Sequence, residues 1–467
     1  MAENNLKENK MGVMPIKKLI ISVSLPMIIS MLVQALYNIV DSLFVSRADP
    51  SGVASAAVNL AFTAQNFMIA VATGTGVGVN ALVSRALGEK NFSLANKIAK
   101  NGIFLAICSY LLFLVLGLTL VEPFYRLMND DPMVVAEGVK YLRVCLCFSF
   151  GIFIEIVYER LMFSTGKTVL AMITQTTGAV ANIILDPIFI FKKGEGILGI
   201  GVFGMGAEGA AIATVIGQII SGILGIILHH ALNKELSTRM LKFRPSLKQI
   251  KNIYAIGVPS IIMASIGSVM NSGVNLILKS FDGIVTQAQN VFGFYFKLQS
   301  SVFMPVFGLN NGLIPIISYN YGAQNRKRII KTIKLGCVYA SAIMILGCAL
   351  FQLIPDKLLG FFGDAVDLSI GVPALRIIST CFIFAGFCIV LGSVFQSFGH
   401  GVMSMMVSIA RQMLVLLPVA YLMSLTGNVQ NVWLAFPIAE IASTVVSVLF
   451  FRRLYKTKIK RIPDGIE

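Results

Sequence analysis

Long apolar stretches fill most of this sequence and leave little polar chain between them. Twelve are long enough to cross a lipid bilayer, whose hydrocarbon core of about 30 Å is spanned by roughly 20 helical residues. They lie near residues 17–46, 52–82, 95–120, 133–160, 168–192, 201–229, 247–280, 284–316, 329–354, 367–395, 401–425 and 430–452. Lipid offers no partner to a free backbone group, and the stretches lack the alternating pattern of barrel strands. Each stretch is therefore predicted to be a helix.

The composition supports a membrane protein and argues against several soluble classes. Only 13% of the residues are charged and the mean hydropathy is +0.81, whereas about 25% of the residues of a soluble domain are charged. In a soluble chain the net charge of +16 would suggest nucleic acid, but here the basic residues occupy short loops between apolar stretches. The seven cysteines lie in apolar stretches without metal-ligand spacing. We therefore expect no nucleic acid, no disulfide framework and no cofactor.

Lysine and arginine accumulate in alternate loops, and this asymmetry predicts the orientation of the chain. Basic clusters lie near both ends, in residues 7–18 and 452–461, and in the central loop, residues 234–251. The loops that alternate with the basic ones carry few lysines or arginines. Because cytoplasmic loops of membrane proteins collect these residues, the sequence predicts a multi-pass protein of a bacterial inner membrane with both termini in the cytoplasm.

The two halves of the sequence resemble each other at a nearly constant separation. Three residues at the end of the second stretch recur 234 positions later, at the end of the eighth: Ser84, Gly88 and Asn91 match Ser318, Gly322 and Asn325. Because each repeat has an even number of spans, both halves keep one orientation. The predicted fold is an all-α membrane protein with twelve transmembrane helices in two pseudo-symmetric six-helix bundles. The predicted parts are a cytoplasmic N-terminal segment (1–16), an N-terminal half (17–230), a linker (231–246), a C-terminal half (247–452) and a basic tail (453–467).

Polar side chains inside the first and fifth stretches share helical faces. The first stretch carries Gln34, Asn38 and Asp41, and the fifth carries Gln175, Asn182 and Asp186. Their spacing of three, four or seven residues places each set on one side of its helix. A charged side chain at the centre of a bilayer costs several kcal/mol, so these acids are functional candidates. Two aspartates at similar depth in one half can share a proton or a sodium ion.

Four motifs extend this pattern along the chain. They are the run Asn182–Phe191 with its Leu185-Asp186-Pro187 core, the run Gly206–Thr214, the loop Gly88-Glu89-Lys90-Asn91, and Ser164-Thr165-Gly166-Lys167-Thr168. Together they resemble the multidrug and toxic compound extrusion (MATE) family, most closely its bacterial DinF-like and MepA-like members. The resemblance covers about residues 17–452 and implies a transporter, which is not an enzyme and uses no cofactor besides a coupling ion.

The resemblance also implies roles for individual residues. In that family the residues matching Asp41, Asn182, Asp186 and Thr214 form the cation site of the N-terminal half. That site would take H+ or, alternatively, Na+ at Asp41 and Asp186, and no other metal is expected. Pro26 and Pro187 interrupt helix hydrogen bonding and are candidate hinges. DinF-like relatives bend the first helix at such a proline, and the alternative for Pro26 is a static kink.

Five polar residues are expected to contact the substrate: Gln34, Asn38, Glu155, Glu159 and Gln175. Many family members have Asn at the position of Glu159, which leaves its role open. Glu159 binds a cationic substrate, relays protons, or pairs with Arg160. For Lys297 and Arg411 in the second half, a structural ion pair is favoured over substrate binding. Family members with a second cation site carry acids in the seventh and eighth spans. Here the seventh span has Asn271 and Asn275, with Asp282 only at its outer end, and the eighth span has Lys297 and no acid, so no second cation site is expected.

These features predict a secondary active multidrug efflux antiporter. It would export amphipathic, cationic small organic molecules as a monomer, in exchange for H+ or Na+, through Asp41 and Asp186. The nearest alternative is a flippase for lipid-linked saccharides from the same superfamily, although such proteins have more basic cavities. A membrane-embedded enzyme would need a clustered catalytic motif, and we find none. A structural membrane subunit is the remaining alternative.

Overall fold

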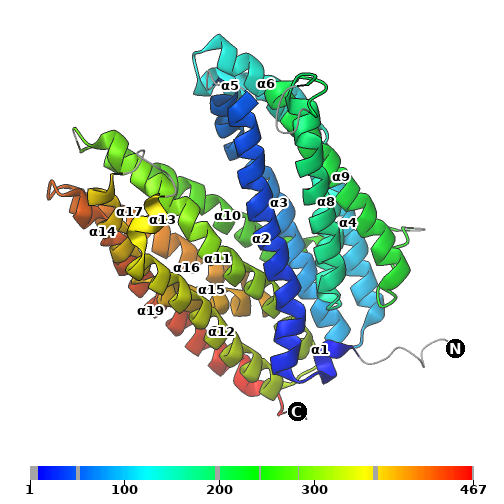
Figure 1. Cartoon of the computed structure of the whole chain (residues 1–467). Helices are drawn as coiled ribbons and strands as arrows, with labels where there is room; N and C mark the ends of the chain where they lie inside the picture. Colours follow the sequence, from blue (N-terminus) through cyan, green and yellow to red (C-terminus); the bar gives the residue numbers. More distant parts are fainter. Residues whose placement is uncertain are drawn as a thin grey trace. The chain divides into compact units, whose positions relative to one another are not determined.

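The chain is helical almost throughout (Figure 1). The structure, a computed structural model, describes residues 9–48, 53–194, 200–240, 243–281, 283–360 and 367–464. Within these ranges the bridges of β type are isolated ones, from Lys192 to Val202 and Phe203. The prediction of an all-α protein is confirmed.

Ten helices of the described chain are long and apolar enough to cross a membrane, and two bent pairs bring the total to twelve. Eight of the ten are α2 (Ile16–Ala48), α3 (Val53–Gly88), α4 (Phe92–Thr119), α8 (Thr168–Ile190), α9 (Gly206–Leu232), α10 (Leu247–Leu278), α11 (Val285–Gly322) and α12 (Arg326–Leu353). The ninth joins α16 (Gly401–Ile409), the π-helix η3 (Ala410–Leu416) and α17 (Leu417–Ser424), and the tenth joins α18 (Val429–Val432), α19 (Ala435–Thr457) and η4 (Ile459–Arg461).

The two remaining spans are bent. One pair is α6 (Pro132–Cys147) with α7 (Phe150–Ser164), at 44°, and the other is α14 (Leu368–Ser379) with α15 (Phe382–Ser397), at 48°. Three short helices, α1 (Lys10–Val13), α5 (Val121–Met128) and α13 (Pro355–Gly360), complete the described elements. All twelve predicted stretches therefore correspond to helical segments of sufficient length.

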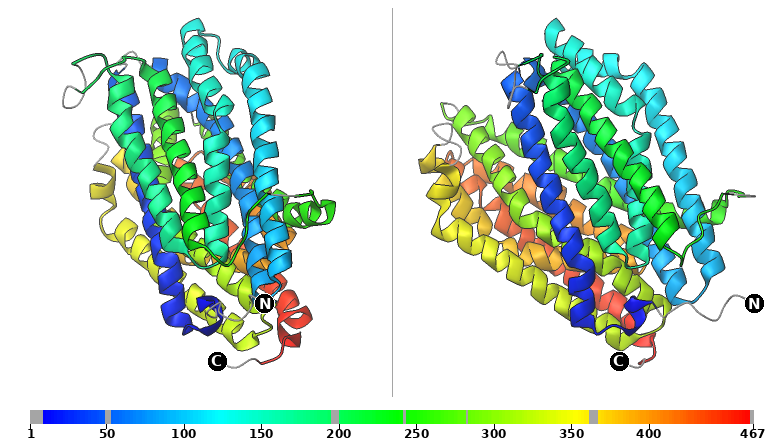
Figure 2. Two further views of the ribbon diagram at one scale, coloured as in Figure 1. Left: turned by 90° about the vertical axis from the view of Figure 1, so that its right-hand side faces the viewer. Right: turned by 45° about the vertical axis from the view of Figure 1, so that its right-hand side comes forward.

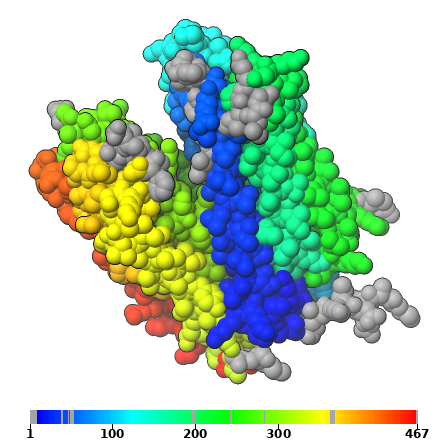
Figure 3. All heavy atoms as spheres, in the orientation of Figure 1, coloured from blue at the N-terminus to red at the C-terminus, as the bar shows by residue number. Residues whose placement is uncertain are grey.

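Large apolar side chains cover the outside of these helices. Leu36 of α2, Leu112 of α4 and Leu414 of η3 are 57%, 56% and 67% exposed, and Figure 3 shows α2 at the surface along most of its length. A soluble monomer rarely exposes such extended apolar surface, because it would face water. The exposed leucines fit helices whose outer faces lie in lipid.

The chain divides into two compact units, and two long helices are each shared between them. Unit 1 comprises Met1–Asn9 and Ile29–Ile261, and unit 2 comprises Lys10–Ile28 and Ile262–Glu467. The first part of α2 therefore packs within unit 2, and the first part of α10 packs within unit 1.

Pairs of glycines allow these shared helices to approach the neighbouring helices closely. In unit 1, Cβ atoms at Gly74 and Gly78 of α3 would overlap the carbonyl oxygens of α10 residues. In unit 2, Cβ atoms at Gly308 and Gly312 of α11 would overlap the first part of α2, the former lying 2.7 Å from the Cα atom of Ile28. The two glycine pairs stand 234 positions apart, which is the separation of the sequence repeat.

Local details of the two units repeat at the same separation. Asn91 caps α4 by accepting a hydrogen bond from the Leu94 amide at 3.0 Å, and Asn325 caps α12 by accepting one from Arg328 at 3.1 Å. The preceding residues, Lys90 and Gln324, have φ values of 56° and 54°. Such a match in capping and backbone conformation confirms the internal repeat.

Glycines also set the distance between α8 and α9, which lie side by side in unit 1 (Figure 2). A Cβ atom at Gly178 would lie 2.9 Å from the Gly217 carbonyl oxygen, and one at Gly217 would lie 2.7 Å from that of Gly178. Closely approaching backbones are the usual result of small residues in membrane helices. This approach brings polar side chains of the two helices within hydrogen-bonding distance.

A buried arginine anchors the start of the chain in unit 2. Arg328 of α12 is 4% exposed, and it donates hydrogen bonds to the backbone oxygens of Met11 at 2.9 Å and Met14 at 2.7 Å. It also donates to Asn320 at 3.1 Å, and Asn320 donates to the Met11 oxygen at 3.1 Å. Carbonyl groups of α1 and of the residue just after it thus obtain partners from α11 and α12.

Replacing Arg328 by alanine should lower the stability of the protein by about 2–4 kcal/mol, because buried carbonyl oxygens would lose charged donors. Thermal unfolding can be followed with a thiol-reactive dye, since Cys145, Cys381 and Cys388 are buried. Arg126→Ala is the control, because Arg126 is 71% exposed and pairs only at the surface with Glu122; the expected loss is under about 1 kcal/mol. Equal melting temperatures for both variants would contradict the anchoring role.

Alanine at Gly217 should destabilise the protein, whereas alanine at Gly293 should not. The new methyl group at Gly217 would meet the Gly178 carbonyl oxygen, but nothing lies within 4 Å of a Cβ atom at Gly293. In an open helical position this exchange stabilises by up to about 1 kcal/mol. The same dye assay compares the two variants, and a shift of the same sign in both would argue against close packing of α8 and α9.

Candidate functional site

Asn182 is the centre of a buried polar cluster in unit 1, which we call the outer cluster: Asp41, Asn182, Asp186 and Thr214. Its side-chain amide donates to Asp186 Oδ1 and to Thr214 Oγ1, both at 3.2 Å. Asn182 is 2% exposed and Asp186 is fully buried. Asp41 of α2 interacts electrostatically with Asp186. All four residues predicted for the cation site therefore lie in one unit, and α2, α8 and α9 contribute them.

Three oxygen atoms of the outer cluster lack a hydrogen-bond donor. Asp41 Oδ1, Asn182 Oδ1 and Asp186 Oδ2 are buried, and no described residue donates to them. Buried polar atoms in proteins almost always have a partner, so each exception requires an explanation. All three atoms are acceptors, and hard oxygen ligands of this kind suit a proton or a small hard cation. A bound proton or cation would supply the partner that these three oxygens lack.

The spacing along α2 brings a tyrosine into the same region. Tyr37 lies four residues before Asp41 and forms a hydrogen bond with Gln34. Its hydroxyl is within electrostatic range of Asp41, Asp186 and also Glu155. Sequence analysis missed Tyr37, although its spacing of four residues from Asp41 was a usable signal. The side chain of Asn38, a predicted substrate contact, lies outside the described residues.

A second polar cluster of unit 1, the inner cluster, contains Glu155, Glu159, Gln175 and Ser221. Gln175 donates to Glu159 Oε2 at 2.7 Å, which joins two residues predicted to bind substrate. Glu155 lies close to Ser221 of α9, whose hydroxyl donates to the Thr174 backbone oxygen at 3.0 Å and which was not predicted from the sequence. Ser221 lies two helical turns beyond Thr214 on the same face of α9.

Arg160 supplies positive charge beside the inner cluster. It is 4% exposed, it interacts electrostatically with Glu159, and its guanidinium group lies 5.2 Å from the centre of the Phe163 ring. This electrostatic interaction supports the alternative in which the charge of Arg160 neutralises the charge of Glu159. Substrate binding by Glu159 stays a prediction.

The two candidate hinges lie inside unbroken helices. Pro26 is within α2 and Pro187 is within α8, directly after Asp186. Each proline removes one backbone donor from its helix. Bending at these positions stays a prediction.

The second half carries a balanced pair of charges in place of free acids. Arg411, in the π-helix η3, donates to Glu440 of α19 at 3.0 Å, and Ser443 donates to Glu440 at 3.2 Å. The Lys297 ammonium group lies 5.4 Å from the centre of the Phe294 ring. In the seventh span Asn275 donates to Asn271 at 2.9 Å, and Asp282 lies outside the described residues. Over the described chain, no three acids, histidines or cysteines are grouped to hold a metal ion.

Comparisons with known proteins agree with this arrangement. A MatE family model matches residues 26–188 and 259–422, once in each half. The multidrug export protein MepA of Staphylococcus haemolyticus is 25% identical over 94% of both chains. A MATE structure in complex with MaL6 has a TM-score of 0.90 at 24% identity, over 98% of this chain and all of that one. The outward-facing conformation of a multidrug resistance MATE family transporter gives 0.89 at 24% identity and the same coverage.

The double match has the period of the sequence repeat, and it includes Asp41 and Asp186 in its first copy. The solved structures share the fold over nearly the whole chain. Since the family model covers more than half of the residues, the chain belongs to the MatE family of multidrug and toxic compound extrusion (MATE) transporters, which are not enzymes.

Proposed function

We propose that this protein is a secondary active antiporter that exports amphipathic organic cations in exchange for protons. The observation that carries the proposal is the set of three buried acceptor oxygens on Asp41, Asn182 and Asp186 without donors. A site that lacks only positive charge is suited to take up and release a coupling cation. The name of the relative MepA, a multidrug export protein, supports drug-like substrates for this chain.

Protons are our first choice for the coupling ion, and Na+ is the alternative. A proton would join Asp41 or Asp186 and turn an unsatisfied acceptor into a donor. A sodium ion would instead need several oxygens at once, and the carboxylates, the Asn182 amide oxygen and the Thr214 hydroxyl offer them. In either case the protein adds no cofactor of its own.

Substrate is proposed to bind at the inner cluster, with Gln34 and Asn38 of α2 as further contacts. Glu155 and Glu159 would attract a positively charged group, and Gln175 already orients Glu159. Tyr37 interacts electrostatically with Glu155 and with both aspartates. The two clusters are therefore close enough for a positive charge bound at one to repel a positive charge at the other. Such repulsion would produce the competition between substrate and coupling ion that antiport requires.

Exchange between states follows from differential affinity. A ligand shifts a conformational equilibrium only by the difference in its binding to the two states. Loading the outer cluster would change the packing of α2 and α8 within unit 1, where Phe44 and Phe191 contact each other at a centroid distance of 6.3 Å. Pro26 and Pro187 are the proposed places where these helices bend. We further propose that the protein acts as a monomer in a bacterial inner membrane with both termini in the cytoplasm.

Asp41→Asn and Asp186→Asn should each abolish gradient-driven export, with a loss of about 100-fold, because an amide takes up no proton at neutral pH. The assay is efflux of a fluorescent organic cation from proteoliposomes under separate proton and sodium gradients. Asp130→Asn is the matched control, since Asp130 is an exposed acid of the same half. Export that both site variants retain in full would refute coupling at the outer cluster, and the gradient that drives the native protein identifies the ion.

Glu155→Gln should raise the half-saturating concentration of a cationic substrate about tenfold, because the loss of one close charge pair costs on the order of 1.4 kcal/mol. A neutral substrate of similar size should be transported as before. Glu137→Gln, which removes a partly exposed acid of α6 that pairs with Lys140, serves as the control. Equal weakening for cationic and neutral substrates would show that Glu155 supports the structure and does not attract substrate charge.

A further inference from the structure

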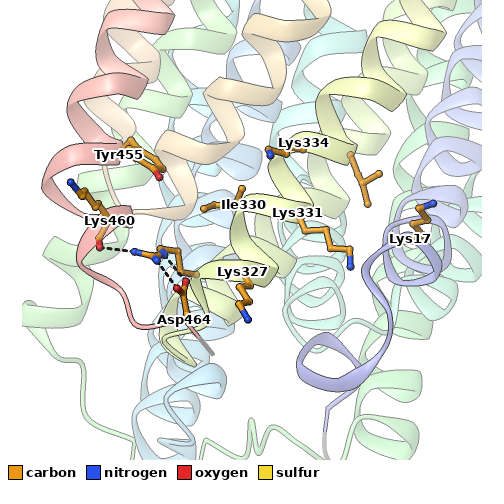
Figure 4. Close-up of a pocket in the computed structure, with 10 residues that line it drawn as sticks. Lys17, Lys327, Ile330, Lys331, Lys334, Tyr455, Lys460 and Asp464 are labelled. Atoms are coloured by element: carbon orange, nitrogen blue, oxygen red, sulfur yellow. Dashed lines mark hydrogen bonds and ion pairs between the residues drawn. The ribbon is translucent and has the colours of Figure 1, made fainter. Parts of the chain in front are cut away.

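A basic pocket lies in unit 2 where α12 begins and the chain ends. Its volume is about 590 Å³, and Figure 4 shows its lining side chains. Its basic residues are Lys17, Arg326, Lys327, Lys331, Lys334 and Lys460. Three segments that are distant in the sequence supply them: the start of α2, the first turns of α12, and the tail.

Three lysines of the pocket share one face of α12. Lys327, Lys331 and Lys334 are spaced i, i+4 and i+7 and are all exposed. Among the described residues that line the pocket, Asp464 is the only acid. It is engaged by Arg326, which donates to both carboxylate oxygens at 2.7 and 2.6 Å. The described lining therefore has six basic residues and one acid.

The depth of the pocket identifies the kind of anion that fits. Arg326 and Lys17 are the first and second residues of membrane-spanning helices, so the pocket lies where these helices leave the hydrocarbon. Phospholipid headgroups occupy this level of the bilayer. Ile330 and Leu335 add apolar lining, and Tyr455 adds an aromatic ring. Such a mixture suits a phosphate group that is attached to an apolar chain.

We propose that this pocket binds the phosphate-bearing headgroup of an anionic phospholipid, in the leaflet that the basic loops predict to be cytoplasmic. Basic pockets between membrane helices on this side are known to recognise such headgroups. The lysines would contact the phosphate oxygens, and Arg326, fixed by Asp464, would hold the tail in place as one wall. The apolar residues would face the start of the acyl chains.

The competing explanation is that these lysines only set the orientation of the chain. The repeat provides a test, because Lys97 and Lys100 of α4 stand 234 positions before Lys331 and Lys334. Both pairs have the same spacing and the same place in their halves. The α12 pair differs from the α4 pair because residues of the tail also line its pocket, namely Tyr455, Lys460 and Asp464. Orientation alone predicts equal behaviour of both pairs.

The experiment is native mass spectrometry of the full-length protein in neutral detergent, titrated with phosphatidylglycerol or with phosphatidylcholine of the same acyl chains. The native protein should bind phosphatidylglycerol more tightly. Lys331→Gln with Lys334→Gln should weaken that binding about fivefold for each lysine removed. Lys97→Gln with Lys100→Gln should change it less than about twofold. Melting temperatures of both double variants show that they fold, and Lys17→Gln with Lys460→Gln gives an independent second variant.

Three results would overturn the proposal. Equal affinity for the two lipids would show that charge does not select the occupant. Equal loss in the α4 and α12 variants would assign the lysines a general surface role. Displacement of the bound lipid by an equal concentration of soluble glycerol phosphate would identify a free anion, and not a membrane lipid, as the ligand of the pocket.

Discussion

The lack of hydrogen-bonding partners in lipid is the constraint on which the rest of this structure depends. It makes every span helical, and it requires polar side chains in the spans to find partners within the protein. Many do so locally: Thr177 donates to the Ile173 oxygen and Ser300 to the Phe296 oxygen, one helical turn back. Among the described buried side-chain atoms that lack a partner, those of Asp41 and Asp186 are the ones that belong to carboxylates. Unsatisfied buried acceptors are costly for folding, which is why we propose a ligand that supplies the missing positive charge.

Close backbone packing turns this constraint into a defined site. Lipid is as apolar as leucine, so helices in a membrane associate mainly through tight contact and hydrogen bonds. The contact of Gly178 with Gly217 gives α8 and α9 that proximity, and the hydrogen bond between Asn182 and Thr214 depends on it. The glycine pairs on α3 and α11 have the same function for the helices that the two units share. Small residues thus determine where polar residues meet.

The sequence predicts the spans, the repeat and the outer cluster well, because each depends on local patterns. Apolar length gives the helices, and helical spacing together with the family resemblance gives Asp41, Asn182 and Asp186. Contacts that arise only from packing could not be foreseen. Arg328 has the sequence environment of an ordinary loop-side arginine, but it is buried against the Met11 backbone. The π-helix Ala410–Leu416 around Arg411 is a further feature that the sequence does not predict.

The two halves keep one scaffold but differ in how they balance buried charge. In unit 2 the carboxylate of Glu440 has the Arg411 guanidinium as a partner at 3.0 Å, so that pair is complete without an added ion. The pair is partly exposed, with 24% of the Arg411 side chain and 12% of the Glu440 side chain accessible, and its opposite charges balance each other. In unit 1 the acids of the outer cluster have no such basic partner among the described residues that contact them. A mobile cation can balance charge only where no fixed charge does, which is why we propose coupling in only one half of the repeated fold.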